Sequence, residues 1–166
     1  MYVFDATPLI YLAKIDRLPL THHLDDPLII PERVFQEVVV EGSAAGYPDA
    51  RRIERAVESN RFERRAAPKS ETWWRLQANP RVSDADVAVL VLAAATGGVG
   101  VMDEQYGRDL ARAENIETRG TAWIVLTAYD CGELSQREAT NAIDALLDAG
   151  WYCSPDLYAA IRRKIE

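Results

Sequence analysis

Two acidic residues directly follow short apolar segments of the kind that form buried strands. Asp5 follows residues 2–4, and Asp103, with Glu104 beside it, follows residues 99–102. In an open α/β sheet, ligands bind beyond the carboxyl ends of the strands, near the point where the strand order reverses. Neither acid has a directly adjacent basic residue that would neutralise it. These positions therefore predict carboxylates that meet at one edge of a sheet.

Two further acids lie in segments with helical periodicity. Glu37 is flanked by Val34 and Val38, so its side chain is expected close to the buried face of its helix. Asp86 lies in the first turn of an almost wholly apolar helix, two residues after Asp84. An acid at a helix start interacts favourably with the macrodipole, and Asp84 can fill that role. Asp86 is then left over for the site, and Asp84 is a candidate either for supporting the ligands or for an additional ligand.

Carboxylates gathered at one sheet edge repel each other, so they either take up protons or hold cations. Oxygen-rich sites of this type suit Mg²⁺ or Mn²⁺. Two such ions, about 3.5–4 Å apart, can activate a water and stabilise the departing oxygen during phosphodiester hydrolysis. The predicted metal-binding and catalytic residues are Asp5, Glu37, Asp86 and Asp103, and the further candidate ligands are Asp84 and Glu104.

The composition limits the classes of function. The chain has 166 residues, 48% of them hydrophobic, which fits one domain with a real core. Its net charge of -7 argues against a general nucleic-acid-binding protein, which would normally be basic. The N-terminal segment lacks the features of a secretory signal, and no apolar stretch approaches the ~20 residues that span a membrane. We expect a cytoplasmic protein with two reduced cysteines, Cys131 and Cys153.

Short strands alternate with helices along the chain, which favours a mostly parallel sheet covered on both faces. Strands are expected at residues 2–4, 28–30, 61–66, 99–102 and 116–118. Helices are expected to begin at Thr7 (as N-cap) and Pro31, and to cover residues 49–59, 71–77, 84–96, a segment through 113, 121–131, 135–148 and 155–164. Residues 42–48 are expected to form a loop, and residues from about 133 a C-terminal helical hairpin. The whole chain, 1–166, is expected to form one domain.

Four segments carry a resemblance to a known family. Residues 5–13, 30–39, 83–86 and 101–104 are similar to the acidic motifs of the PIN-domain nucleases, which include the toxins of VapBC-type toxin–antitoxin pairs. Residues 120–158 resemble a subfamily of predicted nucleic-acid-binding PIN proteins. The resemblance implies a three-layer α/β/α sandwich, dependence on Mg²⁺ or Mn²⁺, and cleavage of RNA. It also implies a homodimer and, for a toxin, a cognate antitoxin protein that blocks the site.

Several other residues have two interpretations. The hydroxyl group of Thr7 could line the site or only cap a helix. Arg51, Arg52 and Arg55 belong to a dense basic cluster that either forms a solvated face or contacts RNA phosphates. The adjacent histidines, His22 and His23, are expected at the surface rather than on a metal.

The function predicted from the sequence is a metal-dependent endoribonuclease. The alternative is a non-catalytic module of the same fold that binds RNA or a regulatory protein. A measurement of Mn²⁺ binding separates the two hypotheses, because the absence of binding would support the non-catalytic module. Exposed aromatic residues such as Trp151 and Tyr152 are candidates for a dimer interface.

Overall fold

The computed structural model describes all 166 residues and contains one parallel sheet. The strands are β1 (Tyr2–Phe4), β2 (Leu28–Pro31), β3 (Glu63–Arg65), β4 (Val99–Val101) and β5 (Glu117–Arg119). Their spatial order is β3-β2-β1-β4-β5, and every neighbouring pair is parallel. The predicted α/β class with a parallel sheet is confirmed.

The first strand of the chain is the central strand of the sheet. Tyr2 pairs with Leu28 on one side and with Val99 on the other. The strand order reverses here, because β2 and β3 extend in one direction from β1 while β4 and β5 extend in the other. The carboxyl ends of β1 and β4 therefore flank the switch point, where α/β proteins bind ligands.

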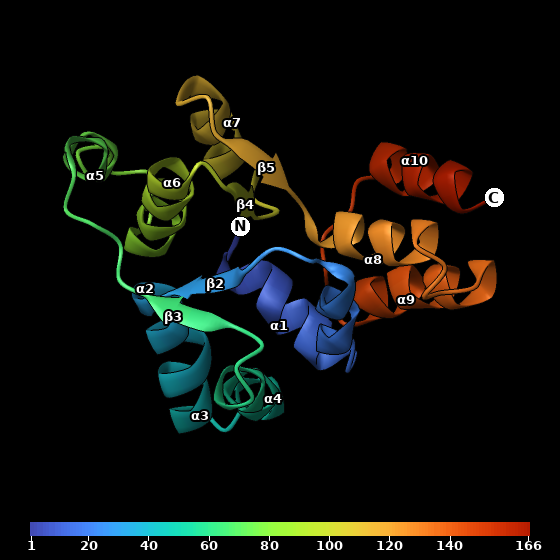
Figure 1. The fold of residues 1–166 in the computed structure, drawn as a ribbon. Helices are drawn as coiled ribbons and strands as arrows, with labels where there is room; N and C mark the ends of the chain where they lie inside the picture. The colour runs from blue at the N-terminus through green and yellow to red at the C-terminus, as the bar shows by residue number, and fades with distance from the viewer.

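Helices cover both faces of the sheet, which confirms the three-layer architecture. They are α1 (Ala6–Lys14), α2 (Glu32–Phe35), α3 (Gly42–Ala44), α4 (Pro48–Glu58), α5 (Glu71–Gln77), α6 (Asp84–Thr96), α7 (Gln105–Ala113), α8 (Thr121–Asp130), α9 (Gln136–Asp148) and α10 (Pro155–Ile165), with a 3-10 helix η1 (Leu18–His23) and a π-helical segment η2 (Gln36–Glu41). Figure 1 shows α5 and α6 on one side of the sheet and α1 and α8 on the other. No helix combines the length and hydropathy needed to cross a membrane.

The apolar helix α6 has the bounds that the sequence predicts. Ser83 caps it by accepting the backbone N–H of Asp86, and the Asp86 carboxylate accepts the N–H of Ser83 in return. Gly97 ends the helix in the left-handed conformation, with φ of 59°. Its residues 87–93 are all buried, since α6 lies between the sheet and the surrounding helices.

Two local expectations are wrong, and one helix was not expected. Thr7 is not an N-cap: α1 already begins at Ala6, because Asp5 stays extended and its N–H bonds to Val101 O at 2.9 Å, which continues the sheet. Residues 42–48 are not all loop, since η2 and α3 continue the helical path to Ala44. The 3-10 helix η1 was not predicted, because its sequence lacks the apolar periodicity of an α-helix.

The C-terminal helices form a compact group beside the sheet. Figure 1 shows α8, α9 and α10 packed against one another, so the expected hairpin from about residue 133 has α8 as a third member. Tyr129 Oη donates to Ile165 O at 3.0 Å, and Tyr158 Oη donates to Asp144 Oδ1 at 2.9 Å. These bonds fix α10 against both α8 and α9.

Candidate metal centre

Asp5 is the most unusual acid in the molecule. It is 6% exposed, and Asp49 is the only other buried carboxylate. Its position follows from the backbone: β1 ends at Phe4, and the Asp5 N–H still bonds to the last residue of β4. The carboxylate therefore lies at the switch point of the sheet, although a buried charge is costly unless a partner or a cation compensates it.

The surroundings of Asp5 disfavour its ionised form. Burial, followed by the negative charge of Asp86, raises its pKa to about 7; Glu37 and Asp103 add to the rise, and the Ala6 backbone N–H partly opposes it. The three acids that act on Asp5 are the three that the sequence predicts to share its site. The structure thus brings the four predicted residues into one electrostatic group.

Glu37 and Asp86 reach this group from two different helical segments. Glu37 lies in η2 and is half-buried, with Val38 and Val39 packed in the core beside it. Asp86 lies in the first turn of α6 and is also half-buried. Besides the cap, one of its oxygens accepts the Ser83 hydroxyl at 2.6 Å. These bonds all reach Asp86 Oδ2, so the other oxygen accepts no hydrogen bond within the protein.

Asp103 is held by three hydrogen bonds. Its Oδ1 accepts the backbone N–H of Thr121 at 2.7 Å, and its Oδ2 accepts the Thr121 hydroxyl at 2.6 Å. Oδ2 also accepts the indole N–H of Trp151 at 3.0 Å. Gly120 leaves room for this arrangement, since a Cβ there would lie 2.8 Å from Asp103 Oδ1. Donors that fix a carboxylate in this way are typical of the groups that orient metal ligands.

The two acids that compete with the preferred ligands have different surroundings. Glu104 is exposed, and its Oε2 accepts the N–H of Gly107 at 2.7 Å, so it caps α7. Asp84 is exposed and makes no side-chain hydrogen bond or ion pair. Neither is among the charges that raise the pKa of Asp5. The electrostatic surroundings of Asp5 therefore favour Asp103 over Glu104 and Asp86 over Asp84.

We predict that Asp103→Asn lowers metal-dependent cleavage by roughly tenfold or more, because a charged ligand is lost. The single amide oxygen also cannot accept both the Thr121 N–H and the Trp151 indole N–H, so the side chain is oriented less firmly. Glu104→Gln should leave cleavage within about twofold of wild type, since a glutamine oxygen can still cap α7. Initial rates on one labelled RNA at saturating Mn²⁺ measure both variants. Equal losses in the two variants would contradict the assignment of Asp103.

The charges of this donor set favour a divalent ion, but the spacing of the side chains limits how many of them can bind it directly. A buried carboxylate with three acidic neighbours is the charge pattern that a cation stabilises. The side chains do not, however, form a tight group of three or more metal-ligating residues. Mg²⁺ tolerates such a site, because it usually keeps several waters and binds directly to only one or two carboxylates.

A cavity of about 660 Å³ opens next to Asp103. It is bounded by α1, by the start of α7 and by the segment that leads into α10; the lining residues include Thr7, Tyr11, Glu104, Arg108 and Trp151. Thr7 therefore lies at the edge of the candidate site and does not cap a helix. Of its two interpretations, the structure favours the one in which its side chain lines the site.

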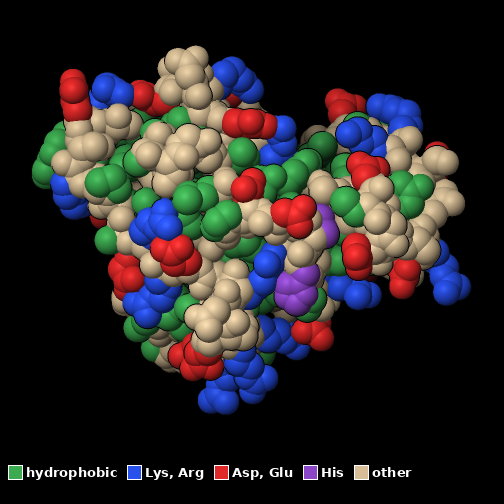
Figure 2. Space-filling model, viewed as in Figure 1, with side chains coloured by type: hydrophobic (Ala, Val, Ile, Leu, Met, Phe, Trp, Pro, Cys, Tyr) green, Lys and Arg blue, Asp and Glu red, His purple; other side chains and the backbone are tan.

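The predicted basic cluster lies elsewhere. Arg52 donates to the carbonyl of Ala13 at 2.7 Å, at the end of α1 opposite to Asp5. Arg51 and Arg55 are exposed on the same helix, α4. Figure 2 shows basic and acidic side chains interspersed over one face of the molecule, without a broad basic patch. RNA contact by Arg51, Arg52 and Arg55 stays a prediction. Any RNA bound there would lie well away from Asp5.

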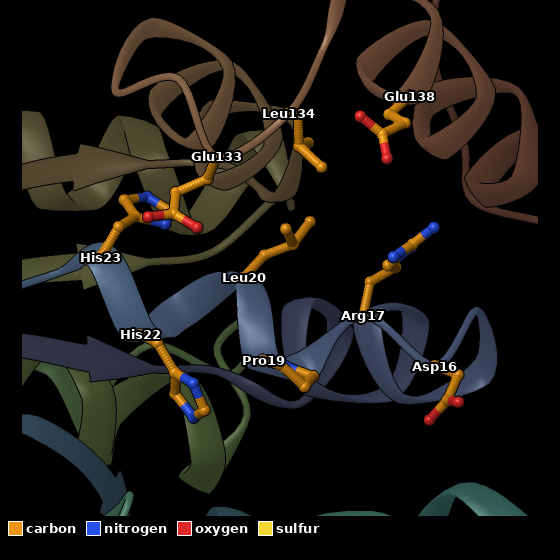
Figure 3. Close-up of a pocket in the computed structure, with 9 residues that line it drawn as sticks. All are labelled: Asp16, Arg17, Pro19, Leu20, His22, His23, Glu133, Leu134 and Glu138. Atoms are coloured by element: carbon orange, nitrogen blue, oxygen red, sulfur yellow. The ribbon is translucent and has the colours of Figure 1, made fainter.

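The two histidines border a separate cavity of about 350 Å³ between η1 and the start of α9. Figure 3 shows His23 beside Glu133, while His22 points away from it. Neither ring nitrogen of His23 has a hydrogen-bond partner, and burial lowers its pKa against the opposing effect of Glu133. Both histidines were expected at the surface; His22 is exposed, whereas His23 is half-buried.

Sequence reasoning missed the residues that support Asp103. Trp151 was expected to be exposed, but it is 4% exposed and bonds to Asp103; only Tyr152 is exposed, at 85%. Thr121 was expected only as a helix start. A glycine and a hydroxyl residue directly after a strand could have signalled a close contact there, but nothing in the sequence points to Trp151.

Comparisons with known proteins agree with the fold. A family model described as "DUF3368: PIN domain" matches residues 1–166. A solved structure, "Crystal structure of PAE2754 from Pyrobaculum aerophilum", is similar with a TM-score of 0.52 at 19% sequence identity, covering 77% of this chain and 96% of that one. That likeness concerns the fold alone. No curated protein matches this chain.

Proposed function

This chain belongs to the PIN-domain family, whose members are generally nucleases, and from that premise we propose that it is an endoribonuclease dependent on Mg²⁺ or Mn²⁺. The observation that carries the proposal is the Asp5 carboxylate, which is buried at the switch point with a pKa raised to about 7 by burial and by its acidic neighbours. A group that the fold keeps at such a cost is typical of a functional site.

The chain supplies the ligands and their supports. Asp5, Glu37, Asp86 and Asp103 would hold one or two divalent ions. Such ions, when bound, lower the pKa of a coordinated water and stabilise the departing oxygen of a phosphodiester. Thr121 and Trp151 fix the orientation of Asp103, and the capping box fixes that of Asp86. No histidine lies near Asp5 that could act as a general base.

RNA is proposed as the substrate because the acidic motifs resemble those of the PIN toxins. The same resemblance supports a role as the toxin of a toxin–antitoxin pair. A cognate antitoxin, a homodimer and a cytoplasmic location all stay predictions. Mass measurement of the purified chain, and of the chain co-expressed with an adjacent small reading frame, would test the first two.

The proposal is tested by cleavage of a labelled single-stranded RNA with Mn²⁺, with Mg²⁺ and with excess chelator. We expect cleavage with either ion, none with chelator, and recovery when the ion is restored. A DNA strand of the same sequence serves as the control for substrate class, and isothermal titration with Mn²⁺ measures binding without RNA. A chain that neither binds Mn²⁺ nor cleaves RNA would support the non-catalytic binding module instead.

A further inference from the structure

We propose that the cavity beside Asp103 is a subsite for one unpaired nucleotide of a single-stranded RNA, with Arg108 on a phosphate and Tyr152 stacked on the base. The inference rests on the proposed function, because it places the nucleotide next to the phosphodiester that the metal centre would cleave. Asp103 lines the cavity and also belongs to that centre, so a strand bound in the cavity would lie next to the centre.

The size of the cavity suits a nucleotide. Its volume is about 660 Å³, within the range of about 300–1,000 Å³ typical of small-molecule sites. The lining combines apolar and polar groups: Trp151 and Leu157 supply apolar surface, and Gln105 and Ser154 offer polar groups. A base needs this combination of a flat apolar contact and a few hydrogen-bonding groups at its edge.

Arg108 is the only basic residue that lines the cavity. It is half-buried on α7 and forms no ion pair or side-chain hydrogen bond, although nine ion pairs occur elsewhere in the structure. One of its terminal nitrogens lies close to Gly120, 3.5 Å from the position that a Cβ would occupy there. A half-buried guanidinium without a partner, beside a candidate metal centre, is suited to a phosphate oxygen.

Tyr152 projects from the rim of the same cavity and is 85% exposed, the highest value among the large hydrophobic side chains. The backbone beneath it is fixed. Tyr11 Oη donates to Gly150 O at 3.1 Å, and the Trp151 N–H donates to Leu146 O at 2.9 Å. An exposed aromatic ring on a fixed backbone is an efficient platform for stacking, because little order is lost on binding.

The substrate must be single-stranded at this point. A base inside a duplex is already stacked and paired, so it cannot enter a cavity or stack on Tyr152 without leaving the helix. The face drawn in Figure 2 also shows no broad basic patch of the kind that would hold a duplex by its phosphates. A loop or a single strand supplies an unstacked base directly.

The test is binding, measured by fluorescence anisotropy of a labelled eight-nucleotide RNA of mixed sequence. It is run with chelator present in the wild-type chain, and also in the Asp5→Asn chain, so that cleavage does not interfere. Tyr152→Ala should raise Kd roughly 5- to 100-fold through lost stacking. Arg108→Gln should raise Kd and reduce the slope of log K against log salt by about 0.7, the value for one phosphate contact on a single strand.

Matched controls separate the subsite from general effects. Tyr47→Ala removes another exposed tyrosine, and Arg112→Gln removes an arginine from the same helix that is paired with Asp109. Both should leave Kd within about twofold of wild type. The subsite is refuted if Tyr152→Ala and Arg108→Gln bind like the controls, if a duplex binds as tightly as the single strand, or if no RNA binds. Binding as predicted, without any metal-dependent cleavage, would refute the proposed function and leave the subsite standing.

Discussion

Replacement of Asp5 by asparagine should lower metal-dependent cleavage by more than roughly 100-fold and, in the metal-free protein, raise the free energy of unfolding. The loss of activity follows from removal of the buried central ligand of the site. The gain in stability follows from the rise of the Asp5 pKa from 3.8 to about 7, which corresponds to a cost on the order of 4 kcal/mol for the ionised form. Asparagine keeps the shape without the charge.

The pH dependence has a defined sign. The folded chain binds the Asp5 proton more tightly than the unfolded chain, so the wild-type stability falls as the pH rises from about 4 to about 7. Asp5→Asn should lack this part of the decline. The gain of the variant should therefore be largest above pH 7 and vanish near pH 4.

Urea denaturation with chelator present, from pH 4 to pH 8, measures this difference. Asp25→Asn, which changes an exposed loop acid, is the matched control and should follow the wild type. Saturating Mn²⁺ should stabilise the wild type more than Asp5→Asn. The assignment of Asp5 would be wrong if the variant were less stable than wild type at pH 8, or if it cleaved RNA at the wild-type rate.

A second large effect is expected at the start of α6. Asp86→Asn should lower cleavage by roughly 100-fold or more, whereas Asp84→Asn, two residues away, should stay within about twofold of wild type. The fold should survive in both, because an asparagine oxygen can still accept the Ser83 N–H that the Asp86 carboxylate accepts. Single-turnover rates and circular dichroism of the two variants provide the comparison.

Coupling to Asp5 gives this second prediction an independent readout. Asp86 is the charge that raises the Asp5 pKa most. In the Asp86→Asn background, the stabilisation gained by Asp5→Asn should therefore be smaller than in the wild type. A double-mutant cycle measures the difference. Additive stabilities would contradict the proximity of the two carboxylates, and equal activity losses for Asp84 and Asp86 would contradict the choice between them.

The elements that carry the acids were predictable because their signals are local. The apolar segments before Asp5 and Asp103 identify strands, and Ser83 with the apolar run after it identifies the start and course of α6. Since parallel strands place their carboxyl ends at one edge, the meeting of Asp5 and Asp103 followed from the strand pattern alone. The role of Asp86 was only half predicted, because it also closes the capping box with Ser83.

The surroundings of Asp103 were not predictable, since they depend on contacts between distant segments. Thr121 lies 18 residues later and Trp151 lies 48 residues later, and both donate to the same carboxylate. Trp151 and Tyr152 are adjacent aromatic residues, and both are expected to be exposed on the sequence alone, yet only Tyr152 is. Which of the two turns inward is decided by the packing of the C-terminal helices, which no local pattern encodes.

The bond between Trp151 and Asp103 has a consequence for protein synthesis. The ribosome makes Asp103 well before Trp151, since 48 residues separate the two. A nascent chain can therefore display all four carboxylates while the indole that orients one of them has yet to be translated. The order of synthesis therefore delays the full set of hydrogen-bond donors to Asp103 until residue 151 has been added to the chain.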